Sequence, residues 1–112
     1  MKPLHPNDLK SFLNRFDDFK GSEFRHLEIL SPTSFIITLA TQDSARGYDW
    51  ISVDLEFSDA NAANLLDNSK LTLIDMTDGV EISHHGTNFA FSILKSTFFI
   101  ECVYIKYQEG AF

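Results

Sequence analysis

Three of the four histidines, His26, His84 and His85, are the residues to test first for metal binding or proton transfer. An imidazole ligates zinc and exchanges protons near neutral pH. His84 and His85 continue a predicted strand that begins at Val80, and adjacent side chains of a strand point to opposite faces. The two rings therefore cannot chelate one ion, and we expect exposed turn histidines before Gly86. The sequence predicts no metal site and no cofactor.

Paired carboxylates could divide the roles of general acid and general base. Asp75 and Asp78 belong to a segment typical of a tight turn, and Asp54 and Glu56 alternate along a predicted strand. No Gly-rich phosphate loop, nucleophile elbow, Cys-x-x-Cys pair or His-Glu-x-x-His motif occurs in the sequence. Cys102 has no cationic neighbours that would activate a thiol. Catalysis is unsupported, although a site assembled from scattered residues would leave no motif.

Residues 48–57 alternate almost strictly between apolar and polar side chains. The alternation places Tyr48, Trp50, Ser52, Asp54 and Glu56 on one face and apolar residues on the other. Tyrosine and tryptophan are frequent at interface hot spots, so this face is interpreted as a surface that binds a protein partner. The predicted site comprises Tyr48, Trp50, Asp54, Glu56 and Asp59. In the alternative interpretation the two aromatic residues lie under the N-terminal helix or a loop, and only the carboxylates reach water.

The net charge of −7 comes from the middle of the chain. Residues 43–81 contain nine acidic residues and two basic ones, whereas the two flanking segments are neutral. A local excess of negative charge attracts basic partners and repels nucleic acid phosphates. The sequence therefore favours a basic protein as partner and disfavours nucleic acid, unless the acids serve only to keep the protein soluble.

The chain of 112 residues has the length of a single domain, residues 1–112. Its single cysteine, Cys102, lies in an apolar run and is expected to be a buried free thiol, which favours a reducing compartment. The N-terminus lacks the apolar core of a signal peptide, and no stretch approaches the ~20 apolar residues that span a bilayer. We expect a cytoplasmic protein without membrane association.

A helix and a series of strands should position these residues. Apolar side chains at helical spacing, with Pro6 at the start and Gly21 at the stop, predict an amphipathic helix over residues 6–20. The pattern then changes to strands, interrupted by a loop at 42–47, a short helix from Ser58 to about Leu66, and turns at Asp78-Gly79 and His85-Gly86. The fold class is α+β, with the helix packed on a curved, mainly antiparallel sheet of six or seven strands. The predicted strands are 23–30, 35–40, 48–57, 71–76, 80–83, 89–93 and 98–107; the last is assigned as a central strand, with a buried helix as its alternative.

Four short runs combine aromatic, β-branched and charged residues in order. They are Phe24-Arg25-His26-Leu27-Glu28, Ile36-Ile37-Thr38-Leu39, Tyr48-Asp49-Trp50-Ile51 and Leu55-Glu56-Phe57, followed by the predicted β meander. This layout resembles that of small bacterial immunity-type proteins, which neutralise a competitor's toxin by binding it. The resemblance implies a non-enzymatic inhibitor of a basic toxin, and it transfers no functional residue to a numbered position.

Two other functions remain open from the sequence. A small-molecule-binding protein or enzyme could use the concave side of the sheet, with His26, His84 and the carboxylates as polar lining. A structural homo-oligomer could associate through strand edges or through the strand at residues 98–107.

Overall fold

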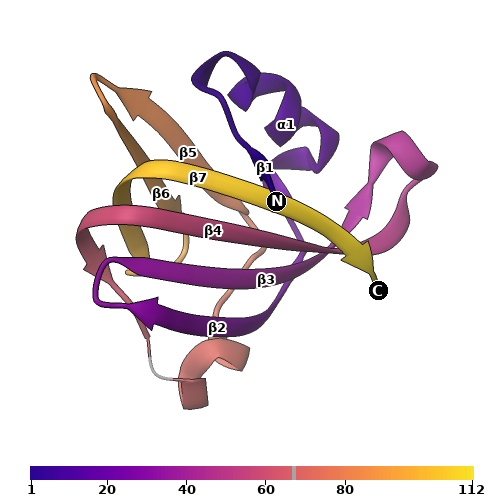
Figure 1. Cartoon of the computed structure of the whole chain (residues 1–112). Coiled ribbons are helices and arrows are strands. Elements are labelled where there is room, and N and C mark those ends of the chain that lie inside the picture. The colour runs from indigo at the N-terminus through magenta and orange to yellow at the C-terminus, as the bar shows by residue number, and fades with distance from the viewer. Residues whose placement is uncertain (67) are drawn as a thin grey trace.

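The chain folds as a small α+β domain with one short N-terminal α-helix and a seven-stranded antiparallel sheet that does not close (Figure 1). The computed structural model describes residues 1–66 and 68–112, without the side chains of Asn68 and Thr72. Along the sheet the order is β2-β3-β4-β7-β6-β5, and β1 pairs with β7. The strands are β1 (Lys2–Pro3), β2 (Glu23–Ser31), β3 (Ser34–Asp43), β4 (Asp49–Asn64), β5 (Val80–His85), β6 (Asn88–Ile93) and β7 (Phe99–Ala111).

Six of the seven predicted strands are present, and the structure lengthens several of them. The segment 98–107 is confirmed as a strand in the middle of the sheet, since β7 lies between β4 on one side and β6 and β1 on the other. One edge of β7 pairs with β4 along its length, and the other pairs with β6 and β1 over parts of its length. The two strands at the ends of the sheet path are β2 and β5.

The predicted helix from Ser58 to Leu66 is wrong, because β4 continues to Asn64. Asp59 has φ of 55°, and a bulge between Ala60 and Ala62 shifts the register with β7, beyond which the pairing continues to Asn64. Such a bulge adds one residue to a strand and lets the ladder continue beyond it. Ser58 does not cap a helix; its hydroxyl lies 3.4 Å from a carboxylate oxygen of Glu56.

The predicted strand at residues 71–76 is also wrong. This region begins with a 3₁₀ helix, η4 (Asn68–Leu73), which packs beside β2. Leu71 and Met76 are its buried anchors, so its apolar residues cover the core without joining the sheet. Asp78-Gly79 consequently leads from this segment into β5, whereas His85-Gly86 does form the predicted turn between β5 and β6.

The predicted helix over residues 6–20 consists of three pieces: η1 (Pro6–Asp8), α1 (Leu9–Arg15) and η2 (Asp17–Phe19). The helix does not continue to Lys20, because Asp17, Asp18 and Phe19 have φ of 52°, 54° and 58°. This left-handed turn brings the fully buried Phe19 ring to 5.9 Å from Phe12, between ring centroids. Gly21, with φ of 72°, has the left-handed conformation that was predicted for the stop.

The core lies between one face of the sheet and this N-terminal segment. Phe12 of α1 packs on Tyr107 of β7, with ring centroids 4.9 Å apart, and Phe57 and Phe91 meet at 5.0 Å. Apolar side chains such as these fill the core-facing side of the sheet. Among the described residues, no helix is long and apolar enough to cross a membrane.

Candidate functional site

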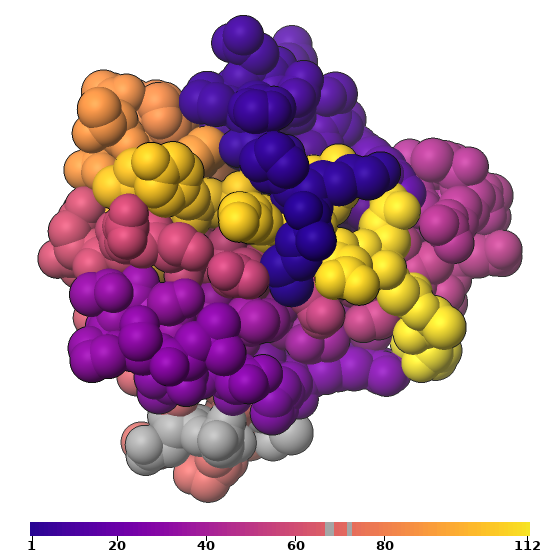
Figure 2. Space-filling model, viewed as in Figure 1, coloured from indigo at the N-terminus to yellow at the C-terminus, as the bar shows by residue number. Residues whose placement is uncertain are grey.

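The side chains of β4 that point away from the core form the surface that we call the β4 outer face: Trp50, Ser52, Asp54 and Glu56. The predicted alternation is confirmed, since Ile51, Val53, Leu55 and Phe57 on the opposite face are all buried. Figure 2 shows this side of the molecule, where β3 and β4 lie uncovered and the indigo N-terminal segment crosses the yellow β7.

Tyr48 and Asp59 lie at the two ends of this surface. Tyr48 precedes β4 with φ of 66° and is 65% exposed, so it does not follow the alternation of the strand. Asp59 is exposed just before the bulge of β4. The structure thus places three of the five predicted site residues, Trp50, Asp54 and Glu56, on one face of one strand, with the other two beside it.

Trp50 is covered by the C-terminal aromatic residue and not by the N-terminal helix. Its ring centroid lies 5.7 Å from that of Phe112, and the guanidinium of Arg25 lies 4.4 Å from the Phe112 centroid. Trp50 remains 40% exposed and Phe112 60%. The small residues Ser52 and Gly110, which are paired in the sheet, leave room beside these rings. Phe112 was not predicted as part of the site because it follows the last strand and belongs to no periodic pattern.

The carboxylates of the β4 outer face are positioned by neighbouring strands. Asp54 accepts a hydrogen bond of 2.7 Å from the hydroxyl of Thr38 on β3. Glu56 lies in register with Ile36 on one side and Lys106 on the other, and Glu28 of β2 pairs with Ile36 in the same row. Carboxylates from two strands therefore share this face with one lysine.

Several other acids of residues 43–81 lie away from this face, so the charge excess in the sequence is not one surface. Asp75 and Asp78 lie beside the turn before β5, 4.0 and 3.8 Å from the ammonium of Lys95. Asp43 is buried at the end of β3, and Asp67 lies outside the described residues. Asp54 and Glu56 are thus the acids of this segment that share a face with Trp50.

Asp43 is the centre of an ion cluster that was not predicted. Arg15 of α1 donates to both carboxylate oxygens of Asp43, at 2.8 and 2.6 Å, and also contacts Glu109 of β7. Arg46 lies 3.5 Å from each of the two carboxylates. The hydrogen bonds from Arg15 hold the pKa of Asp43 below its ordinary value, despite burial. The cluster joins the helix to two strands and leaves no unpaired group for chemistry.

His26 lies on β2, whereas His84 and His85 are consecutive residues of β5. His26 is exposed on β2, opposite Thr38, and His85 is exposed at the end of β5. His84 is half-buried, with its ring 4.6 Å from that of Phe89 between centroids, so it is not the exposed turn histidine that was expected. Within the described part of the chain, no three His, Cys, Asp or Glu residues gather to hold a metal ion.

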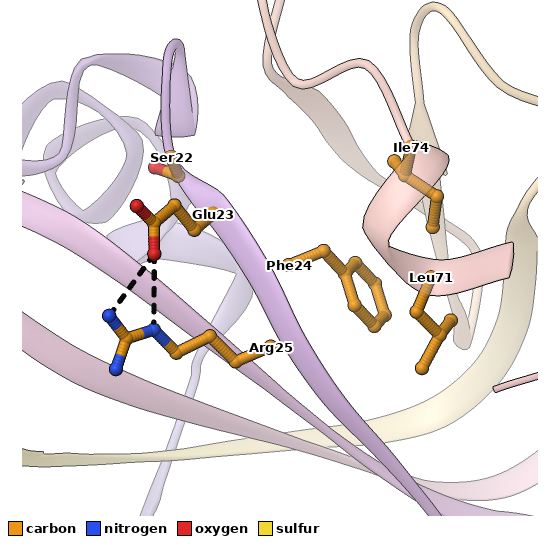
Figure 3. Close-up of a pocket in the computed structure, with 6 residues that line it drawn as sticks. All are labelled: Ser22, Glu23, Phe24, Arg25, Leu71 and Ile74. Atoms are coloured by element: carbon orange, nitrogen blue, oxygen red, sulfur yellow. Dashed lines mark hydrogen bonds and ion pairs between the residues drawn. The ribbon is translucent and has the colours of Figure 1, made fainter. Parts of the chain in front are cut away.

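A cleft of about 430 Å³ lies between β2 and η4 (Figure 3). Glu23 and Arg25 point to one side of β2 and pair with each other at 3.1 Å, whereas Phe24 points toward Leu71 and Ile74. The charged groups of the lining therefore neutralise each other, and its apolar part belongs to the contact between β2 and η4. We assign this cleft no chemistry.

Comparison with family models, with curated proteins and with solved structures gives no match. Only the chain's own residues bear on what it binds. Those residues provide one surface with aromatic and acidic side chains together, the β4 outer face.

Cys102 is a buried free thiol, as predicted. Its S–H donates to the carbonyl of Tyr104, with Sγ and O 3.4 Å apart, and burial raises its pKa to about 12. At about pH 8 the thiolate fraction should be on the order of a thousandfold below that of an ordinary cysteine, with pKa near 8.5. We expect dithiobisnitrobenzoate to label Cys102 in the native protein at least about a thousandfold more slowly than in the protein unfolded by guanidinium chloride. Equal rates would contradict this assignment.

Proposed function

We propose that this chain is a non-enzymatic protein-binding domain that captures a basic protein through the β4 outer face. The observation that carries the proposal is the position of the exposed Trp50 and Phe112 rings beside Asp54 and Glu56. Interface hot spots combine a large aromatic anchor with polar neighbours in this way.

The anchor is held in place before any partner arrives. Trp50 belongs to β4, which is paired on both sides, and its ring contacts Phe112, which in turn contacts Arg25. An ordered aromatic residue loses little conformational entropy on binding. The surface is therefore suited to rigid docking, with Tyr48 at its edge as a second aromatic contact.

The charge of this face indicates the class of partner. Glu28 and Glu56 share one row of the sheet with Lys106, and Asp54 lies two residues before Glu56 on the same face. Arg25, the cation that contacts Phe112, is paired with Glu23. Such a face attracts cationic proteins and accelerates their association at low ionic strength. In the narrower form of the proposal the partner is a basic toxin and the chain is its immunity-type inhibitor, in agreement with the family resemblance of the sequence.

The test begins with capture from a native lysate and continues with one identified, purified partner. We expect a basic partner whose Kd is weakened at least tenfold, about 1.4 kcal/mol, by the double substitution Trp50→Ala and Asp54→Asn. Asparagine at position 54 can still accept the hydrogen bond from Thr38. The association rate of the parent should fall with rising salt concentration, measured by stopped flow.

A matched control removes one exposed apolar side chain and one carboxylate charge elsewhere on the surface. It combines Leu94→Ala with Glu81→Gln on β5; Leu94 is 51% exposed in the parent. This control should bind like the parent. The proposal fails if the two double variants bind the partner equally, or if the identified partner is acidic.

A further inference from the structure

A second cleft, of about 370 Å³, lies where the sheet is interrupted along one edge of β7. β6 pairs with β7 as far as Cys102, and β1 pairs with Lys106 and Tyr107. The ends of β1 and β6 therefore face each other across residues 103–105 of β7. Three buried side chains line the cleft: Leu4, which follows β1, Phe89 of β6 and Ile105 of β7.

The polar groups of this lining share one property: each can donate a hydrogen bond, and none is a carboxylate. They are His5, His84, Thr87, Tyr104 and Lys106. Three other clefts of comparable size each contain an acidic residue, namely Glu23, Asp8 or Glu109. In a chain with sixteen acidic residues and nine lysines and arginines, a cleft without a carboxylate is a distinct environment.

Lys106 is available to a ligand. It lies in register with Glu56, but the ion pairs found among the described residues do not include it. Its side chain is exposed, so its ammonium can reach a ligand at the rim without the cost of burying a charge.

We propose that this cleft binds a small apolar monocarboxylate, such as a short fatty acid. The hydrocarbon lies against Leu4, Phe89 and Ile105, and the carboxylate accepts hydrogen bonds at the rim, with Lys106 as its principal partner. Ligand pockets of about 300–1,000 Å³ typically combine apolar walls with a few polar groups that orient the ligand. This inference does not rest on the proposed function, because neither Trp50 nor Phe112 lines the cleft; Lys106 lies beside both the cleft and the β4 outer face.

Octanoate and its neutral isostere octanamide provide a direct probe, with the full chain and amide NMR shifts as readout. A ligand of ten heavy atoms at about 0.3 kcal/mol per atom should bind with a Kd in the millimolar range. We expect octanoate to shift the amides of residues 4–5, 84–89 and 103–106, and to bind at least fivefold more tightly than octanamide. Equal affinities, or shifts spread over the whole chain, would overturn the proposal.

Two variants separate the charge from the shape of the cleft. Lys106→Gln should reduce octanoate affinity about fivefold, at the upper end of what an exposed charge pair contributes, and leave octanamide binding unchanged. Lys20→Gln makes the same charge change outside the cleft and should bind octanoate like the parent. Val103→Phe, which fills the cleft from a half-buried position, should abolish binding of both compounds while the circular dichroism spectrum stays native. Unchanged octanoate binding in Lys106→Gln or in folded Val103→Phe would refute the assignment.

Discussion

Replacement of Gly79 by alanine is expected to lower the free energy of unfolding by about 3 kcal/mol, the combined cost of backbone strain and overpacking. A Cβ at this position would lie 2.1 Å from the backbone carbonyl oxygen of Asp18. Gly79 also has φ of 73°, a left-handed conformation that is sterically unfavourable for residues with a Cβ atom. A flexible side chain could move aside, but here a backbone atom must shift.

The backbone around Gly79 has little freedom to shift. Its N–H donates to Met76 and its carbonyl accepts from Leu94, at 3.0 and 3.2 Å. On the other side, Asp18 belongs to the left-handed turn that seats the fully buried Phe19. Relieving the clash would therefore disturb either the start of β5 or the packing of the N-terminal segment.

Gly47→Ala and Gly86→Ala are matched controls. Both glycines have φ of 63°, and an added Cβ would have no atom within 4 Å. These variants should lose only about 1 kcal/mol, the cost of the left-handed conformation. Urea unfolding of the three variants and the parent measures the difference. If Gly79→Ala is no less stable than the two controls, the result would contradict the close contact between position 79 and the carbonyl of Asp18.

The strands could be predicted from the sequence because burial of one face imposes a period of two. Residues 48–57 show this most clearly, since every second side chain from Ile51 to Phe57 is buried. Strand pairing outweighs local preference elsewhere in the chain, and there the sequence pattern does not predict the structure. Residues 58–64 have few strand formers, yet they pair with the apolar half of β7 on both sides of the bulge between Ala60 and Ala62.

Contacts between residues far apart in the chain could not be predicted. The face that includes Trp50 followed from alternation, but the position of Phe112 against it depends on the course of the chain after β7. The cluster of Arg15, Asp43 and Glu109 likewise joins three elements that only the fold brings together. The left-handed turn at Asp17 was invisible because residues with side chains rarely adopt it and no glycine marks it.

Asp43→Asn should be nearly as damaging as Gly79→Ala, with a loss of about 3 kcal/mol in the free energy of unfolding. The Asp43 side chain is fully buried, and it is the shared acceptor for Arg15, Arg46 and the amide of Ala45, which donates at 2.9 Å. Asparagine has a similar shape, but it removes the charge that neutralises Arg15. Asp75→Asn is the control, because Asp75 is exposed and also has a lowered pKa. We expect little change there.

The pH dependence distinguishes a lost ion pair from a mere packing defect. Hydrogen bonds from Arg15 lower the pKa of Asp43 in the folded state, so folding favours its ionised form. This stabilisation is complete above the ordinary aspartate pKa of about 3.9 in the unfolded chain, and it is lost as pH falls through the lowered folded pKa. The stability difference between the parent and Asp43→Asn should therefore be constant from about pH 7 to about pH 5 and narrow as the pH falls below about 4. Urea titrations from about pH 7 to pH 3 measure it. A difference that stays constant over this range would show that the charge of Asp43 does not stabilise the fold.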